Sequence, residues 1–283
     1  MVNLSWGTLA GEQKVDTEIE AKPRKHAQGM RFESVNALVT GAGRGFGSLI
    51  SIALAKEGAN VVVAYNKSKE GAQKISDEIK GMGRKSITAK VDITKWDEVK
   101  TMTEEVWKNF GPLDLLVNNS GEVSSKQMSW REITEEAIDQ TLAVDVKGTL
   151  FMIHEIGKRM FERKSGTIVN IASNVIVTGS PRAPQYAASK YGVIGLTKSY
   201  ALAFAPWVRV NAACPGYMDT EATTTRKDWT PQRRKWIVDH TALKRIGKPD
   251  DIVPLVLFLA SDDSIQMTGN IVIADGGFSM PGA

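Results

Sequence analysis

The stretch ALVTGAGRGFGSLISIALAKEGANVVVAY, residues 37–65, decides the fold class. Its two ends, ALVT and NVVVAY, are short apolar runs rich in β-branched side chains, which predicts two buried strands. Between them lies a glycine-rich turn, followed by SLISIALAKEG, whose apolar residues recur at helical spacing until a natural helix end at Gly58. Strand, glycine turn, helix and strand in this order form the opening βαβ unit of a doubly wound sheet.

The same alternation continues along the chain and predicts a single α/β domain over residues 32–283. We expect further strands at 86–92, 112–121, 166–173, 208–216 and 270–275. We expect helices at 71–83, at 94–111, at 133–164 as one long helix or two abutting ones, around Tyr186 as far as Ala205, at 232–240 and at 250–262. This pattern predicts a mainly parallel seven-stranded sheet with helices on both faces, in three α/β/α layers.

Residues 1–31 show neither clean periodicity nor a strand. We expect a flexible N-terminal extension. The alternative is an arm that packs on a neighbouring subunit through Leu4, Trp6 and Leu9.

The composition excludes several classes of protein. Hydrophobic residues at 42% and charged residues at 24% are ordinary for a soluble globular domain. The net charge of +4 is spread along the chain without a dense basic run, so we expect no nucleic acid partner. No apolar run reaches the ~20 residues of a membrane span, and no secretory signal is seen. The single cysteine, Cys214, fits a reducing compartment, so a cytoplasmic enzyme without a metal site is expected.

The turn after the first strand is a candidate dinucleotide site. Gly41, Gly45 and Gly47 fit the spacing G-x-x-x-G-x-G. Glycines permit a tight turn and let the backbone approach a pyrophosphate, and the following helix directs its free N–H groups toward that charge. A purely structural turn is the alternative, but the position between a first strand and a helix favours a binding site.

Charge near this turn predicts which dinucleotide binds. Sheets that bind NAD usually place an acid at the end of the second strand, where it holds the ribose hydroxyls. Here Tyr65 is followed by Asn66 and Lys67, with no acid, and Arg44 lies inside the glycine turn. A cation without an opposing carboxylate suits a 2′-phosphate, so NADP(H) is predicted over NAD(H).

The segment SNVIVTGSPRAPQYAASK, residues 173–190, is the candidate catalytic site. Tyr186 and Lys190 lie four apart in a predicted helix, so they share one face. An ammonium beside a phenol stabilises the phenolate, which lets Tyr186 exchange a proton with a substrate oxygen. Ser173 ends a predicted strand, at the edge where open α/β sheets bind ligands. The three residues predict hydride transfer to or from a carbonyl, although the Tyr–Lys pair alone also fits an ordinary aromatic and a solvated charge on a packed helix.

Several motifs in one order identify the family. They are TGAGRGFG from Thr40, VD at Asp92, NNSG from Asn118, the serine at Ser173, YAASK from Tyr186, and CPG at Pro215 with Thr220 after it. With these motifs, the chain from Val35 onward resembles the short-chain dehydrogenase/reductase family, most of all the 3-oxoacyl-acyl-carrier-protein reductases. The resemblance implies a Rossmann-type fold, NADP(H) as cofactor, interconversion of a ketone and a secondary alcohol, and a homotetramer.

The resemblance also implies roles for single residues. Ser173 hydrogen-bonds the substrate oxygen, Tyr186 exchanges its proton, and Lys190 binds the nicotinamide ribose. The predicted cofactor-binding set is Gly41, Gly43, Arg44, Gly45, Phe46, Gly47, Tyr65, Asn66, Lys67, Asp92, Ile93, Asn118, Ser120, Gly121, Tyr186, Lys190, Pro215, Gly216, Met218 and Thr220.

One position departs from the family pattern. The family usually carries an asparagine in the helix before the serine strand, and this chain has Asp145 there. In the family, the backbone carbonyl of that asparagine helps to hold a water that relays protons to the lysine. An aspartate can keep that backbone role, and its charge would stabilise a protonated Lys190. We therefore include Asp145 among the catalytic residues.

The substrate is less determined than the cofactor. A small-molecule ketone or alcohol is expected, with a 3-oxoacyl thioester among the candidates. Reductases that act on acyl carrier proteins tend to carry two basic residues near the entrance of the site, which bind the acidic carrier. Lys164 matches one of these positions, but Trp207 occupies the other, so only Lys164 supports an acyl carrier protein as partner. In the family, the variable loop that corresponds to residues 217–245 usually forms the substrate lid. Their aromatic side chains favour an apolar or aromatic ketone, unless they only pack the lid against the body.

Two other functions fit the same motifs. One is an NAD-dependent alcohol or sugar dehydrogenase that runs in the oxidative direction. The other is a non-catalytic NADP-binding regulator, which only the departure at Asp145 supports.

Overall fold

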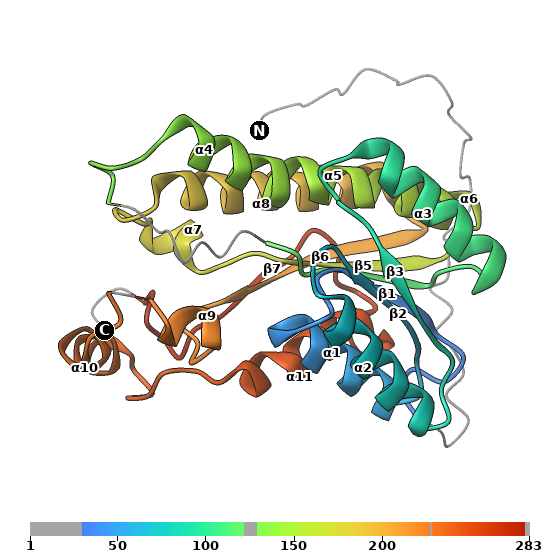
Figure 1. Cartoon of the computed structure of the whole chain (residues 1–283), viewed down its shortest axis with the longest axis horizontal. Helices are drawn as coiled ribbons and strands as arrows, with labels where there is room; N and C mark the ends of the chain where they lie inside the picture. The colour runs from blue at the N-terminus through green and yellow to red at the C-terminus, as the bar shows by residue number, and fades with distance from the viewer. Residues whose placement is uncertain (1–29, 122–128, 227, 281–283) are drawn as a thin grey trace.

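The computed structural model describes residues 30–121, 129–226 and 228–280. Apart from its last two residues, the predicted N-terminal extension lies outside these ranges. Seven strands form one sheet in the order β3-β2-β1-β4-β5-β6-β7, and every neighbouring pair is parallel, which confirms the predicted fold class (Figure 1). The strands are β1 Asn36–Val39, β2 Asn60–Tyr65, β3 Ser86–Lys90, β4 Leu115–Asn118, β5 Gly166–Ile171, β6 Val208–Pro215 and β7 Ile271–Ala274.

Helices cover both faces of the sheet. One layer holds α1, α2 and α11, and the other holds α3, the helix from α4 to α6, and α8 (Figure 1). Within the described ranges, no helix is both long and apolar enough to cross a lipid bilayer. The helices are α1 Gly45–Lys56, α2 Lys69–Gly81, α3 Trp96–Asn109, α4 Glu135–Leu142, η1 Ala143–Gly148, α5 Thr149–Met152, η2 Ile153–Gly157, α6 Lys158–Glu162, α7 Val175–Thr178, α8 Pro184–Phe204, α9 Glu221–Thr224, α10 Pro231–His240, α11 Pro249–Ala260 and η3 Asp262–Ser264.

Alternate strand residues supply the two halves of the core. Val39 and Val63 pack on the side of α1 and α11, whereas Leu38 and Val62 pack on the side of α3 and α8. Successive side chains of a strand point to opposite faces, so a strand covered on both faces is apolar at consecutive positions. This is why the short run NVVVAY predicts a central strand correctly.

The long helix after β4 differs from a regular α-helix. It runs without a break from Glu135 to Glu162, but η1 and η2 are π-helical turns. A π turn inserts one extra residue into the helix and is frequent at functional sites. Asp145 lies within η1, so the backbone irregularity falls at the position that departs from the family pattern.

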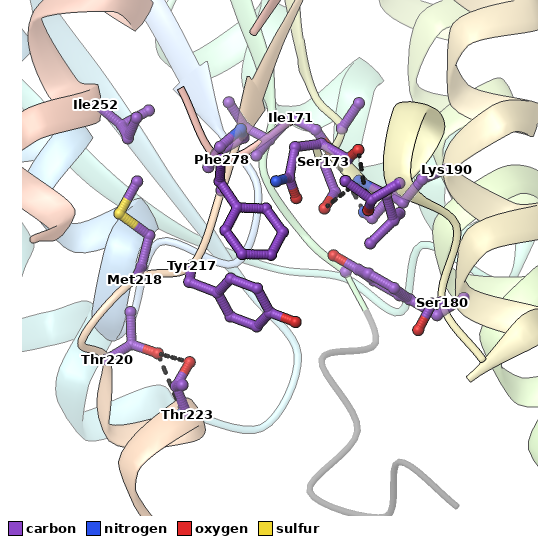
Figure 2. Close-up of a pocket in the computed structure, with 18 of the residues that line it drawn as sticks. Ile171, Ser173, Ser180, Lys190, Tyr217, Met218, Thr220, Thr223, Ile252 and Phe278 are labelled. Atoms are coloured by element: carbon purple, nitrogen blue, oxygen red, sulfur yellow. Dashed lines mark hydrogen bonds between the residues drawn. The ribbon is translucent and has the colours of Figure 1, made fainter. Parts of the chain in front are cut away.

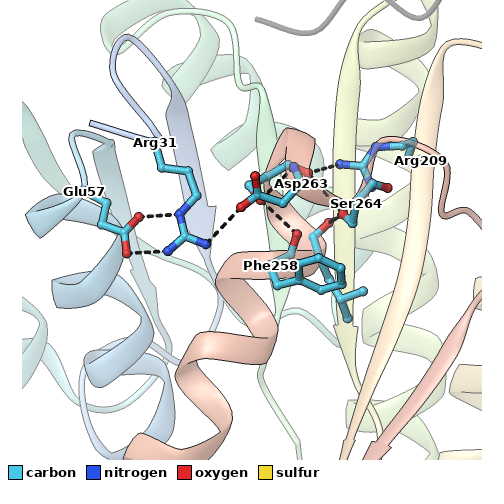
Figure 3. Close-up of polar contacts among 8 residues, drawn as sticks. Arg31, Glu57, Arg209, Phe258, Asp263 and Ser264 are labelled. Atoms are coloured by element: carbon cyan, nitrogen blue, oxygen red, sulfur yellow. Dashed lines mark hydrogen bonds and ion pairs between the residues drawn. The ribbon is translucent and has the colours of Figure 1, made fainter. Parts of the chain in front are cut away.

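Two arginines outside the sheet's binding edge tie distant segments together (Figure 3). Arg31 donates to both carboxylate oxygens of Glu57, at 2.6 and 2.8 Å, and to Asp263 at 3.4 Å. Arg209 in β6 donates to the backbone carbonyl of Ser264 at 3.1 Å. These contacts link the end of α1 and the strand β6 to the turn after α11.

Candidate active site

The glycine turn lies beyond the carboxyl end of β1, where the strand order reverses between β1 and β4. Gly45 opens α1 with a positive φ of 58°, and a Cβ added there would meet nothing within 4 Å. Arg44 occupies the N-cap without a side-chain cap hydrogen bond, and the first turn of the helix holds no acid. An uncapped helix start beside open space fits a pyrophosphate. Helix α1 begins at Gly45, three residues before Ser48, where the sequence pattern predicted its start.

The turn also packs against the loop after β2. The backbone N–H of Ala42 donates to Ala64 at 2.9 Å, and a Cβ at Gly43 would lie 2.7 Å from the carbonyl oxygen of Ser68. This brings Arg44, which is exposed, close to the exposed side chains of the residues that follow Tyr65.

The end of β4 is connected to β1 and β5. The Thr40 hydroxyl accepts hydrogen bonds from the backbone N–H groups of Asn119 and Ser120, at 3.0 and 2.9 Å. Asn118 is buried and donates to Asn170 in β5 at 2.9 Å, so its amide bridges two strands. Its predicted contact with the cofactor ribose stays a prediction. The sequence analysis gave Thr40 only as the first residue of its motif, and the structure shows that its hydroxyl holds the end of β4.

The adenine side of the predicted site lies after β3. The Asp92 carboxylate accepts from the backbone and hydroxyl of Thr94, at 3.0 and 2.8 Å, which shapes the loop before α3. Ile93 is buried against the helix that contains η1, since a Cβ at Gly148 would lie 2.7 Å from it. The contact of Asp92 and Ile93 with adenine stays a prediction.

A cavity of about 420 Å³ lies at the carboxyl ends of β4, β5 and β6 (Figure 2). It brings together Ser173, Tyr186 and Lys190, as the sequence predicted. Ser173 follows β5 by two residues and is buried, while Tyr186 and Lys190 lie one turn apart on α8. Of the remaining predicted cofactor residues, those that line this cavity are Phe46, Gly121, Pro215, Gly216, Met218 and Thr220.

Lys190 is buried beside a carboxylate. Its Nζ lies 3.3 Å from Oδ2 of Asp145, and the Ser189 hydroxyl donates to the same oxygen at 2.7 Å. Burial alone would lower the pKa of Lys190, but the charges of Asp145 and Tyr186 outweigh it and raise that pKa. A Cβ at Gly121 would lie 3.2 Å from Nζ, so a glycine here leaves room for the lysine. The site therefore holds Lys190 as an ammonium at neutral pH, one helical turn from the phenol.

Comparison with known proteins assigns the family. A family model described as enoyl-(acyl carrier protein) reductase matches residues 41–279. The 3-oxoacyl-[acyl-carrier-protein] reductase of Staphylococcus epidermidis is 38% identical over 246 residues, which cover 87% of this chain and 99% of that protein. The chain belongs to the short-chain dehydrogenase/reductase family. It is an oxidoreductase, as the order of its motifs predicted.

Other members of the family support the same assignment. The 3-oxoacyl-[acyl-carrier-protein] reductase of Thermotoga maritima is 35% identical over 249 residues, 88% of this chain and 99% of that protein. A gluconate 5-dehydrogenase from Burkholderia cenocepacia, solved in complex with NADP and tartrate, superposes with a TM-score of 0.83 at 27% identity. The match covers 89% of this chain and 98% of that structure.

In this short-chain dehydrogenase/reductase, Cys214 is a core residue. It is fully buried in β6, and burial raises the pKa of its thiol to about 12. The thiol is therefore protonated at neutral pH and is a poor nucleophile.

The sequence analysis missed much of the far wall of the cavity. It placed Tyr217, Arg226, Arg233 and Trp236 in the lid without assigning them to the cavity, and it assigned no role to Arg182 or Phe278. All six line the cavity. The sequence could have indicated Arg182, since it lies four residues before Tyr186 in the candidate catalytic segment. Nothing in the sequence indicated Phe278, because only the fold brings the segment after β7 to the cavity (Figure 2).

Proposed function

We propose that this short-chain dehydrogenase/reductase interconverts a ketone and a secondary alcohol with NADP(H). The observation that carries the proposal is the meeting of Ser173, Tyr186 and a charged Lys190 in one cavity beside the glycine turn. The relatives named as 3-oxoacyl reductases, and the structure of a related dehydrogenase with NADP, support the same class of reaction.

Each residue has a defined task in this reaction. Ser173 donates a hydrogen bond to the carbonyl oxygen, and Tyr186 gives that oxygen its proton during reduction or takes it back during oxidation. Lys190 stabilises the phenolate that remains on Tyr186. The bound cofactor would supply the hydride for reduction or accept it in oxidation. We assign Asp145 the role of a positioning residue that keeps Lys190 charged.

A turnover assay tests the proposal. Absorbance would follow NADPH oxidation with an acetoacetyl thioester first, then with small ketones and ketosteroids, and NADP⁺ reduction with polyols. Turnover of any one of them supports a ketone reductase. Binding of NADPH without turnover of any would favour a non-catalytic regulator, and faster turnover with NADH would favour an NAD-dependent dehydrogenase.

The preference for NADP(H) rests on Arg44. Gly43, the residue before Arg44 in the chain, packs against Ser68. No acidic residue lies between the end of β2 and that serine. Arg44→Gln is expected to weaken NADPH binding about tenfold and to leave NADH binding nearly unchanged, because only NADPH carries a 2′-phosphate. Calorimetric titration of both cofactors measures this, with Lys56→Gln, an exposed residue at the other end of α1, as the control. An equal loss for both cofactors would contradict the assignment.

We also propose a homotetramer. Helix α8 exposes Tyr191 and Leu202, of which Leu202 is 79% exposed, and α11 and β7 expose Phe258 and Ile273. Helices α8 and α11 lie on opposite faces of the sheet, so these large apolar side chains supply separate surfaces for subunit contacts. Light scattering is expected to give about four times the mass of one chain, as closed symmetric assemblies predict. A monomer at micromolar concentration would contradict this.

An acyl carrier protein remains the less supported partner. The Nζ of Lys164 lies 5.1 Å from the centre of the Trp207 ring, a cation–π contact that engages the one basic residue expected to meet an acidic carrier.

A further inference from the structure

Three arginines meet around a single acid on one side of the cavity. Arg182 comes from the loop before α8, Arg226 follows α9, and Arg233 lies on α10. Arg226 donates to both oxygens of Asp228 at 2.9 Å, and Arg182 forms an ion pair with the same carboxylate. The Nε of Arg233 is 3.7 Å from Asp228, which is too far for a hydrogen bond.

The charges in this cluster do not balance. Three guanidinium groups face one carboxylate, which leaves a net charge of about +2 among them. No acidic side chain is among the described residues that line the cavity, and the fourth cation there, Lys190, is already paired with Asp145. Burial, and then repulsion from Arg233, lowers the pKa values of Arg182 and Arg226. Solvent screens Arg182, whose side chain is 41% exposed, but the charges of the more buried Arg226 and Arg233 are costly unless an anion joins them.

Arg233 also has an unsatisfied donor. Its Nη2 donates to the Tyr217 hydroxyl at 3.3 Å, but its Nε is buried and has no hydrogen-bond partner among the described residues. The side chain of Arg226 is only 9% exposed. Buried polar groups are nearly always hydrogen-bonded, so an unpaired donor at the wall of a cavity indicates a place for an acceptor.

Aromatic rings complete the wall beside these arginines. The rings of Tyr217 and Phe278 meet edge to face with their centres 5.1 Å apart (Figure 2). The centre of the Trp236 ring lies 5.9 Å from that of Phe278. Tyr217 and Trp236 are among the aromatic side chains of the lid for which the sequence predicted an apolar or aromatic ketone. The rings form a wall of the cavity, and the arginines supply its charge.

We propose that the substrate carries an anionic group, a carboxylate or a phosphate ester, that binds Arg226 and Arg233 while its ketone or alcohol carbon lies at Ser173 and Tyr186. Guanidinium groups match the oxygens of both anions with two parallel hydrogen bonds. The position of the reacting carbon rests on the proposed function, whereas the anion site stands on the arginines alone. This replaces the expectation of a purely apolar or aromatic ketone.

Calorimetric binding to the enzyme saturated with NADP⁺, which cannot reduce a ketone, tests the anion site without turnover. Two matched pairs serve as probes: 4-oxopentanoate with its methyl ester, and dihydroxyacetone phosphate with dihydroxyacetone. At least one anion is expected to bind about tenfold tighter than its neutral partner. The pair that shows the difference distinguishes a carboxylate substrate from a phosphate ester.

Variants locate the effect. Arg226→Met and Arg233→Met are each expected to remove most of the preference for the anion. Lys235→Gln removes the same charge from α10 but is exposed and paired with Asp239, so it should keep the preference. Circular dichroism checks the fold of each variant. If the more buried Arg226→Met does not fold, Arg233→Met decides.

The outcomes separate this inference from the proposed function. Equal binding of each anion and its neutral partner, or a preference that survives both arginine variants, would overturn the anion site even if neutral ketones are reduced. A preference that depends on the arginines, in an enzyme that reduces no ketone, would keep the anion site and overturn the proposed reaction.

Discussion

Tyr186→Phe is expected to lower kcat for ketone reduction by about 10³-fold, because a positioned proton donor contributes roughly 10²–10⁴-fold to such a step. The variant removes only the hydroxyl and leaves the half-buried ring in place on α8. NADPH binding should therefore change little. Absorbance measures turnover with any ketone that the wild type reduces, and calorimetry measures the Kd for NADPH.

Tyr191→Phe is the matched control. Tyr191 lies on the same helix, is 55% exposed, and donates its hydroxyl to the carbonyl of Ile176 outside the cavity. The same chemical change there should leave kcat close to that of the wild type. A Tyr186→Phe enzyme that keeps more than about a tenth of wild-type kcat would show that another group transfers the proton.

Asp145→Ala is expected to destabilise the protein by about 3–5 kcal/mol, the usual cost of removing one partner from a buried ion pair. Asp145 is fully buried, and its carboxylate is the charge nearest to Lys190. The variant leaves that ammonium without its counter-charge and takes an acceptor from Ser189. Urea unfolding measures the loss. Asp77→Asn, in an exposed pair with Lys80, is the control and should leave stability unchanged.

Asp145→Asn removes the charge of the Asp145 side chain but keeps its shape. The pH dependence of protein stability in this variant therefore reports on the charge alone. In the wild type, the pKa of Lys190 is raised above 10.5, so its stabilising contribution is present below pH 10.5 and is lost as the pH rises through the raised value. In the variant, burial dominates and lowers that pKa, so stability is lost as the pH falls through the lowered value.

The gap in unfolding free energy between wild type and Asp145→Asn should therefore be widest near neutral pH and narrow above about pH 10. Two stability curves that run parallel from about pH 7 to pH 11 would show that Asp145 does not control the charge of Lys190. A proton relay that is limited by the aspartate would instead show as a many-fold rise in kcat for Asp145→Asn.

Local patterns in the sequence were enough to predict the fold class and the meeting of Ser173, Tyr186 and Lys190 in one cavity. Each βαβ unit is formed by consecutive residues. Its apolar runs, glycine turn and helix end can be recognised from patterns that span a few positions of the chain. Tyr186 and Lys190 are related by one helical turn, and Ser173 by its place at a strand end, so their meeting at one edge of a parallel sheet follows from topology. The glycine turn at Gly41–Gly47 was identified in the same way.

Contacts between distant segments were decided only by the tertiary structure. The π-helical turn η1 carries Asp145, whose carboxylate lies against Lys190 of α8, and no residue type marks this turn in advance. The cluster of Arg182, Arg226 and Arg233 joins three separate segments around Asp228. Charge is visible in a sequence, but which charges share a low-dielectric pocket, and which remain unbalanced there, depends on how the lid folds over the sheet.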